Sequence, residues 1–522
     1  MRKTVSVTVL ALVVMAIAVL SCKDKTKSGL GEDAIIVDTL VYQEQYRPQY
    51  HYTPPAKWMN DPNGLVYANG TYHLFYQYYP EDIVWGPMHW GHAVSNDLLH
   101  WEHKAIALYP DTLGYIFSGS AVYDEKNTSG LAPPGESPLV AFYTYHDPEG
   151  EKSGASDFQT QGIAYSMDGG ENWSKYEGNP VLDNEEGIRD FRDPKVFWYE
   201  EGEYWIMALV AGDHAQFYRS ENLTQWEFMS EFGKESGAHG GVWECPDLFS
   251  LEVDGEERWV LIISINPGAP NKGSGTQYFI GDFDGTTFTA DHEDIRWLDW
   301  GTDNYAGVTY NHAPGGERIF IGWMSNWDYA RDTPTEVWRS AMTLPRKLSL
   351  EKIKDTVRLL NYPIEELDKI IGKREAESIE IPAGDKIVRE STFLSQAEVI
   401  FNTAGRNFSM VLENGEGEKV ELVMDGESGM FSLDRSASGQ TDFKEGFGAV
   451  QQMPVHGLPE GEVEVRVLVD RSSVEVFINK GQYVMTAQLF PNEDYNLLYV
   501  NNNASGPLKL EQFSLNPVQR VW

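Results

Sequence analysis

Cysteine is nearly absent from this chain, and basic residues are scarce. Cys22 and Cys245 are the only cysteines among 522 residues. If Cys22 carries a lipid, as considered below, no disulfide can form within the chain, and the hydrophobic core must hold the fold. Lys and Arg total 41 against 79 Asp and Glu, a formal net charge of −38. Without a basic run, this balance argues against nucleic acid and anionic polymers as partners, and a neutral substrate fits best.

Several catalytic and metal-binding patterns are missing as well. The sequence contains no CxxC pair, HExxH helix, P-loop or GxSxG elbow. Metalloprotease, nucleotide-binding and serine-hydrolase chemistries therefore have no support. The acidic stretch 282–294 lacks the spacing of a calcium loop, so we expect a solvated loop there and no metal site.

The N-terminus has the pattern of an export signal. Arg2 and Lys3 precede an apolar run over residues 5–20, and the small Ser21 precedes Cys22. The string AVLSC resembles a bacterial lipobox, which predicts a signal peptide over residues 1–22, a lipidated Cys22 and a tether over residues 23–45. The protein is then expected to be exported and lipid-anchored in the bacterial envelope. The sequence leaves open whether it faces the periplasm or the cell surface. A plain secretory peptide with a chance cysteine is the alternative.

Aromatic residues are abundant, at 13% of the chain with 16 Trp and 27 Tyr. Such side chains fill β-rich cores and also stack on sugar rings. From about residue 46 to 350 the chain shows short apolar runs separated by Gly, Asn, Asp and Pro, which predicts strands and turns. A loose repeat of Ser, an acidic or amide turn and Trp occurs at 95–102, 166–173 and 220–227, with a diverged copy at 283–288. Four-stranded units with variable loops favour a β-propeller.

The remainder of the chain predicts a second all-β domain. Residues 461–491 alternate between apolar and polar positions, with hairpin turns expected at 470–472 and 479–481, as in a two-sheet sandwich. A helical pattern stands out only at residues 359–376. We therefore expect a catalytic propeller at 46–352, a linker with a short helix at 353–377 and a β-sandwich at 378–522.

Three carboxylates stand in similar surroundings, each beside a Pro and ahead of an apolar run. They are Asp61 in WMNDPNG, Asp193 in DFRDPKVF and Glu244 in GGVWECPDLF. Asp-Pro and Asn-Gly are strong turn formers, so we expect a tight turn that aims Asp61. In a propeller the inner strands converge on a central funnel, where residues distant in sequence meet. Cleavage of a glycosidic bond needs an acid and a second carboxylate, so the pattern is compatible with a propeller hydrolase.

The same motifs carry a specific resemblance. WMNDPNG, FRDP and WECPDLF are similar, in this order, to the motifs of glycoside hydrolase family 32, the invertase, inulinase and levanase group. FSGSAVYD, GWMSNW, RSAMTLPRKL and DRSSVEVF at residues 117–124, 322–327, 339–348 and 470–477 also resemble family segments. The resemblance covers nearly all of the mature chain. It implies an all-β fold, a five-bladed β-propeller followed by a C-terminal β-sandwich.

The resemblance also implies a retaining mechanism that needs no cofactor. Asp61 would be the nucleophile, Glu244 the acid and base, and Asp193 a support for the transition state. Residues implied to bind substrate are Asn60, Gln77, Trp85, Phe117, Ser118, Arg192, Asp303, Tyr305 and Trp323, with Asp303 or Tyr305 tuning Glu244. Cys245 is expected to be a structural neighbour of Glu244.

The expected substrates are levan, inulin and possibly sucrose. The segment WGPMHWGHA resembles exo-acting enzymes, which predicts release of terminal fructose. An endo-acting levanase or inulinase, an inverting arabinan-type propeller enzyme and a surface lipoprotein that binds fructan without cutting it are the alternatives. The preferred linkage and the oligomeric state stay open, and the sandwich is expected to support the propeller without a catalytic residue.

Overall fold

The computed structural model describes residues 42–522. The expected signal peptide, Cys22 and most of the tether lie outside the described residues. Almost all regular structure in the described part is β-strand, and the one α-helix there, α1 (Pro148–Ser153), is short. Among these residues, no helix is long and apolar enough to cross a membrane.

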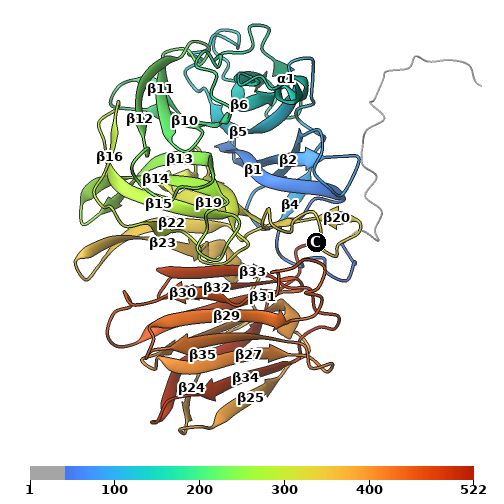
Figure 1. Cartoon of the computed structure of the whole chain (residues 1–522), viewed down its shortest axis with the longest axis vertical. Coiled ribbons are helices and arrows are strands. Elements are labelled where there is room, and N and C mark those ends of the chain that lie inside the picture. Colours follow the sequence, from blue (N-terminus) through green and yellow to red (C-terminus); the bar gives the residue numbers. More distant parts are fainter. Residues whose placement is uncertain (1–41) are drawn as a thin grey trace, which may run out of the picture. The chain divides into compact units, whose positions relative to one another are not determined.

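Five antiparallel sheets form the blades of a propeller, coloured blue to yellow in Figure 1. The first blade contains β1 (Lys57–Ala68), β2 (Thr71–Tyr79), β3 (His89–Ser95) and β4 (Trp101–His103), with β20 (Trp338–Arg339) parallel to β1. The second contains β5 (Tyr115–Tyr123), β6 (Leu139–His146), β7 (Gln159–Ser166) and β8 (Ser174–Lys175). The third contains β9 (Phe191–Tyr199), β10 (Tyr204–Ala211), β11 (Ala215–Ser220) and β12 (Glu227–Phe232).

The last two blades each carry an extra short strand. The fourth contains β13 (Val242–Val253), β14 (Glu256–Asn266), β15 (Gly275–Phe283) and β16 (Phe288–Ala290), with β17 (Arg296–Trp297) paired to β15. The fifth contains β18 (Tyr305–Thr309), β19 (Arg318–Met324), β22 (Arg346–Ile353) and β23 (Thr356–Pro363), with β21 (Ala341–Met342) paired to β19. The inner strands β1, β5, β9, β13 and β18 contact one another in a ring. The ring brings the starts of these strands to one end of the propeller axis.

The sequence repeat marks one recurrent connection. Its four copies link the third and fourth strands of the first four blades. In three copies a Ser hydroxyl at the end of the third strand accepts a backbone N–H, from Leu98, Gly170 and Asn222 in turn. Such local side-chain to backbone bonds close short turns. The repeat is therefore a turn signal, which explains why its copies are unequally spaced.

The first part of the segment expected as a linker, up to Pro363, belongs to the fifth blade. β23 pairs with β22 through a hairpin at Lys354, whose φ is 55°. The expected helix is reduced to a 3₁₀ turn, Glu365–Lys369. Pairing in this hairpin overrides the local helical pattern, because Leu359 and Leu360 are buried in the sheet.

The C-terminal domain consists of two six-stranded antiparallel sheets. One sheet has the order β24 (Glu377–Ile381), β35 (Leu508–Pro517), β26 (Ala397–Thr403), β31 (Val463–Asp470), β32 (Ser473–Ile478) and β33 (Tyr483–Gln488). The other has the order β25 (Lys386–Glu390), β34 (Leu497–Asn502), β27 (Asn407–Glu413), β28 (Lys419–Asp425), β29 (Met430–Ala437) and β30 (Gln451–Pro454). Two short 3₁₀ turns, Pro314–Gly316 and Leu394–Gln396, complete the regular elements of the described part.

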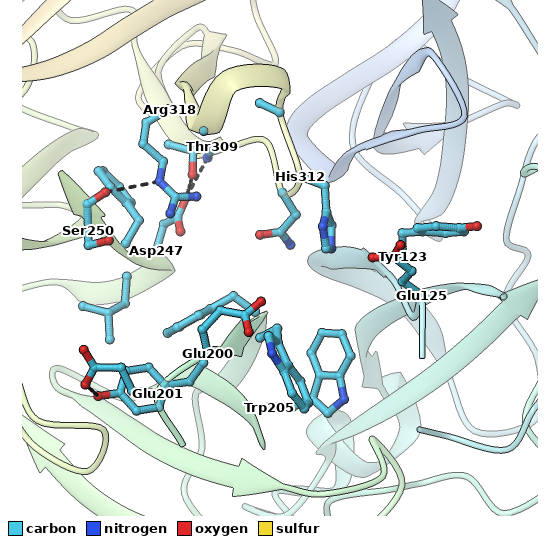
Figure 2. Close-up of a pocket in the computed structure, with 18 of the residues that line it drawn as sticks. Tyr123, Glu125, Glu200, Glu201, Trp205, Asp247, Ser250, Thr309, His312 and Arg318 are labelled. Carbon is cyan, nitrogen blue, oxygen red and sulfur yellow. Dashed lines mark hydrogen bonds between the residues drawn. The ribbon is translucent and has the colours of Figure 1, made fainter. Parts of the chain in front are cut away.

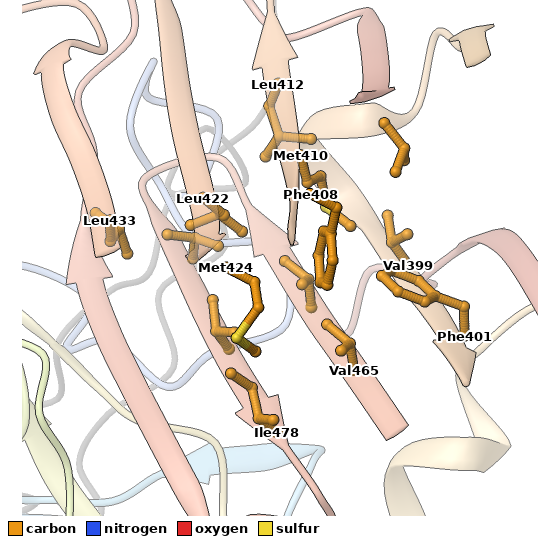
Figure 3. Close-up of a cluster of buried hydrophobic side chains, with 14 of the residues drawn as sticks. Val399, Phe401, Phe408, Met410, Leu412, Leu422, Met424, Leu433, Val465 and Ile478 are labelled. Atoms are coloured by element: carbon orange, nitrogen blue, oxygen red, sulfur yellow. The ribbon is translucent and has the colours of Figure 1, made fainter. Parts of the chain in front are cut away.

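The sandwich core comes from alternate residues of facing strands. Figure 3 shows Phe408, Met410 and Leu412 of β27 close to Val399 and Phe401 of β26. All five side chains are buried. The alternating pattern read from the sequence is therefore the inward face of a sheet, and burial of these apolar groups stabilises the domain without a disulfide.

Buried charges connect the sandwich to the propeller. Arg435 of β29 donates to Asp303, at 2.7 Å, in the loop before β18. Arg346 of β22 donates to Asp299 and forms an ion pair with Glu475 of β32. Because these groups are almost fully buried, the pairs Arg435–Asp303 and Arg346–Glu475 each tie a charge of one domain to its partner in the other.

Candidate active site

Each of the five inner strands has a β-bulge near its start. Two residues of the inner strand face one residue of its neighbour at 60–61, 117–118, 193–194, 245–246 and 306–307. The φ angles of Asp193, Cys245 and Ala306 at these bulges are 66°, 47° and 53°. A bulge bends the strand and re-aims its side chains. The tight turn predicted for the segment around Asp61 is therefore wrong: Lys57–Ala68 is one strand, and a bulge orients the carboxylate.

Asp61 is held by two oxygen or nitrogen donors and, more loosely, by the Cys245 thiol at 3.7 Å. Ser118 Oγ donates to Asp61 Oδ2 at 2.6 Å, and Asn60 Nδ2 donates to Oδ1 at 3.0 Å. Trp58 Nε1 in turn donates to Asn60 Oδ1 at 2.7 Å, which fixes the amide. Burial and the nearby Glu244 raise the pKa of Asp61, and the two donors oppose this shift.

Asp193 lies deep in the same site and is 5% exposed. Its Oδ2 accepts the backbone N–H of Cys245 at 2.9 Å. Burial raises the pKa of Asp193 to about 7, with Arg192 opposing and Glu244 and Asp61 reinforcing the rise. Burial and the same acids raise the pKa of the Cys245 thiol well above its usual range, which argues against a thiolate nucleophile.

Glu244 accepts hydrogen bonds on both oxygens. Arg192 Nη2 donates to Oε1 at 2.9 Å, and the Tyr305 hydroxyl donates to Oε2. Arg192 also donates to Asp190 Oδ1 at 2.6 Å, so its guanidinium is fixed between two carboxylates. The neighbouring acids outweigh burial and raise the pKa of Arg192, which keeps it charged. Glu244 is thus oriented by one cation and one neutral donor.

These groups line a pocket of about 280 Å³. Eight of the predicted site residues meet there with Glu244: Asn60, Asp61, Gln77, Trp85, Phe117, Ser118, Arg192 and Asp193. Gln77 lies opposite the β1 bulge and donates to Asn63 Oδ1 at 2.7 Å. Trp85 meets Phe117 edge to face at 6.0 Å between ring centroids. The pocket therefore combines an acidic floor with aromatic walls.

Three predicted residues lie behind the pocket wall. Asp303 is fully buried and accepts hydrogen bonds from Arg435 and Tyr329. Tyr305 reaches the site only through Glu244, and Trp323 packs behind Trp327 at 4.9 Å. These positions act on the site indirectly, because none of the three lines the pocket.

Several pocket residues were not anticipated from the sequence. They are His146, Glu151, Phe158, Gln159, Asp190, Asn266, Trp327 and Arg331. His146 stacks on Phe117 at 4.3 Å, and its Nδ1 lies 3.2 Å from Gln159 Nε2. Asp190 and Trp327 lie within motifs already noted, DFRDP and GWMSNW, so membership of these motifs was the signal that could have identified them. His146, Glu151 and Phe158 come from strand ends and α1, which only folding brings to the pocket.

A propeller whose inner strands aim three carboxyl groups and an Arg into one pocket defines a glycoside hydrolase. Family models agree: "Glycosyl hydrolases family 32 N-terminal domain" matches residues 51–363, and "Glycosyl hydrolases family 32 C terminal" matches residues 366–516. The chain belongs to glycosyl hydrolase family 32.

Individual relatives support this assignment over most of the chain. A levanase of Bacillus subtilis is 46% identical over 498 residues, covering 93% of this chain and 72% of the relative. An extracellular exo-inulinase of Aspergillus awamori is 41% identical over 489 residues, covering 87% of this chain and 91% of the relative. The crystal structure of exo-inulinase from that organism matches with a TM-score of 0.85 and 38% identity, covering 92% of this chain and all of the other.

Proposed function

We propose that this enzyme hydrolyses β-fructosidic bonds of fructans with retention of configuration. The observation that carries the proposal is the convergence of Asp61, Asp193, Glu244 and Arg192 in one pocket. The levanase and exo-inulinase names of its relatives support fructan as the substrate class. Hydrolysis through two carboxylates requires no cofactor.

In the first step Asp61 attacks the anomeric carbon of a terminal fructosyl unit. Glu244 gives a proton to the glycosidic oxygen as its bond to that carbon breaks, and a fructosyl ester forms on Asp61. Burial raises the pKa values of Asp61 and Asp193, and the nearby charge of Glu244 reinforces both shifts. The role proposed for Asp193 is to bind fructosyl hydroxyls as positive charge develops on the ring.

In the second step a water molecule gives its proton to Glu244 and attacks the anomeric carbon. The ester bond to Asp61 breaks and fructose leaves with its original configuration. Arg192 and Tyr305 hold Glu244 in place for both proton transfers.

Exo action is proposed for the same pocket. A volume of about 280 Å³ is at the lower limit for small-ligand sites, which suits a chain end better than a chain interior. The exo-inulinase relatives support this choice. Internal cleavage would require an open groove, and an endo-acting enzyme is the second candidate.

The test is a time course of products from levan, inulin and sucrose. Fructose alone from the first minutes is expected, whereas early oligosaccharides would contradict exo action. Release of α-fructofuranose as the first anomer, measured by NMR, would contradict retention. Asp61→Asn and Glu244→Gln should each lower kcat at least about a thousandfold. Absence of release from all three substrates would favour a fructan-binding lipoprotein.

The export signal and lipid anchor are also proposals. They rest on the apolar run before Cys22 and on the extracellular naming of the exo-inulinase relatives. Expression of the full chain in a bacterial host with a radiolabelled fatty acid should label the wild type and not Cys22→Ser. Labelling of both chains, or of neither, would contradict lipidation at Cys22.

A further inference from the structure

A second cavity, of about 410 Å³, lies at the other end of the inner strands. Its lining includes Tyr123 at the end of β5, Tyr199 at the end of β9, Ser250 in β13 and Thr309 at the end of β18. The catalytic carboxyl groups lie near the starts of these same strands. The cavity therefore opens at the propeller end opposite the active site.

Buried polar contacts close the axis between the two sites. Lys195 Nζ donates to Asp247 Oδ2 at 3.0 Å and to the Thr309 carbonyl at 2.6 Å. Asn311 Nδ2 donates to the carbonyls of Ala121 and Val196, at 2.8 and 2.9 Å. Because Lys195, Asp247 and Asn311 are buried, a ligand in the second cavity cannot reach the active site along the axis.

The cavity has aromatic walls on several sides. Figure 2 shows Trp205 below the opening and Tyr123 on the side near His312. Trp198, Trp259 and Phe197 complete this set of rings. Flat aromatic surfaces beside a water-filled space bind groups that carry both an apolar face and polar edges.

Polar groups of the cavity lack partners among residues 42–522. Asp247 is fully buried, and its Oδ1 accepts no hydrogen bond, as Oδ2 takes all the donors. Arg318 uses only Nε, toward the Ser250 carbonyl at 3.4 Å, so no hydrogen bond is present at its terminal nitrogens. The buried Trp198 Nε1 is also unpaired. Asp247 Oδ1 and Trp198 Nε1 are themselves too buried to touch a ligand, whereas the terminal nitrogens of the half-buried Arg318 are free to donate to one.

We infer that this cavity is a second carbohydrate site, which binds a stretch of the fructan chain away from the catalytic pocket. Hydroxyl groups both donate and accept, which matches the Arg318 nitrogens and the carboxylates of Glu125 and Glu200 in the lining. The carboxylates of Glu125, Glu200 and Glu201 disfavour an anionic ligand. The identity of the sugar rests on the proposed function, and the site raises affinity for polymer through two-point attachment.

Binding stoichiometry tests the site directly. Asp61→Asn, which cannot turn over substrate, is titrated calorimetrically with an inulin-type and a levan-type tetrasaccharide. Two binding events per chain are expected for at least one sugar. One event is expected once Trp198→Phe or Arg318→Gln is added. Trp198→Phe removes the indole N–H and part of the aromatic surface but keeps one six-membered ring, so it also serves if Arg318→Gln does not fold. Matched controls are Phe228→Ala on β12, which is 51% exposed and outside the cavity, and Arg389→Gln on the sandwich.

Kinetics of the otherwise unmodified enzyme provide the second readout. Trp198→Phe and Arg318→Gln should raise KM for polymeric fructan at least threefold and leave kcat/KM for sucrose unchanged. A single binding event in the parent chain, or equal losses on polymer and sucrose, would overturn the second site. Binding of tetramethylammonium but not sugar at the cavity would also overturn it, since aromatic and acidic groups can bind cations. Failure of the proposed function would show instead as no fructose release by the wild type.

Discussion

Ser118 lowers the pKa of Asp61, the proposed nucleophile, through one short hydrogen bond. Loss of this donor in Ser118→Ala removes an interaction that lowers the pKa of Asp61, so that pKa rises further. Because attack requires the ionised carboxylate, the acidic limb of kcat/KM should move upward by about half to one pH unit. The measurement is a pH–rate profile on sucrose or a fructan.

Ser120→Ala is the matched control for this shift. Ser120 lies two residues along the same strand, is buried, and donates to the Pro194 carbonyl instead of a carboxylate. An unchanged acidic limb in Ser118→Ala, or the same shift in both variants, would contradict the role assigned to Ser118.

Asp193 makes the fold less stable at neutral pH than in acid. Its pKa is about 7 in the folded chain and near 3.8 when unfolded, so the folded state holds the proton more tightly. The associated stability is present below pH 3.8 and is lost as the pH rises through 7. The Tm of Asp193→Asn minus that of the wild type should therefore be more positive at pH 8 than at pH 4.5. A difference in Tm independent of pH would contradict the raised pKa.

The bulged strand β1 depends on Gly64 as well as on Asp61. Gly64 has a φ of 55°, and a Cβ there would lie 2.5 Å from Phe75 Cδ2 and 2.9 Å from Trp90 Cζ3. Gly64→Ala should lower the free energy of unfolding by about 3 kcal/mol, through backbone strain and overlap. Chemical denaturation measures this loss, and activity should fall too because the strand carries Asp61.

Gly70, in the hairpin after β1, separates the two causes. Its φ is 86°, but a Cβ there would meet no atom within 4 Å. Gly70→Ala should cost about 1 kcal/mol, from the backbone conformation alone. Equal losses in the two variants would show that the aromatic contacts at Gly64 do not matter.

The two domains communicate through Asp303, which lies two residues before the Tyr305 that holds Glu244. Arg435 of the sandwich is the cation that neutralises Asp303 in this buried setting. Arg435→Met should destabilise the chain by about 3 to 5 kcal/mol, because it leaves a buried charge unpaired. At temperatures where the variant stays folded, kcat should fall while KM changes little.

Arg389→Met is the control for this comparison, since Arg389 pairs with Glu377 at the surface of the sandwich. The free energy of unfolding, kcat and KM of Arg389→Met should all be close to those of the wild type. If Arg435→Met behaves like this control, the sandwich does not support Glu244, the proposed acid, by this route.

His51 links the segment before β1 to the sandwich and makes the junction pH-dependent. Its Nδ1 lies 2.8 Å from Asp470 and its Nε2 lies 3.3 Å from Glu475. Burial lowers the pKa of His51, but these two acids outweigh it and raise the value from 6.5 to about 9. The stability this contributes, about 3 kcal/mol, is present below pH 6.5 and lost as the pH rises through 9.

Thermal unfolding between pH 6 and 10 measures the contribution of His51. His51→Gln should be less stable than wild type at pH 6, and the difference should shrink by pH 10. A constant difference would contradict a charged His51. The motif DRSSVEVF, which carries Asp470 and Glu475, thus acts at the junction between domains, in keeping with the expected supporting role of the sandwich.

The sequence by itself determined the family, the all-β architecture and the three acids. Strand alternation, turn residues and short motifs are local, so Asp61, Asp193 and Glu244 could be identified without coordinates. Only the tertiary structure decided how they are aimed. The bulges replace the expected turn, β23 replaces much of the expected linker, and Asp303 belongs to the domain junction. Trp327, His146 and the second cavity likewise depend on contacts between distant strands. Such contacts form when blades close around an axis, and no local pattern encodes them.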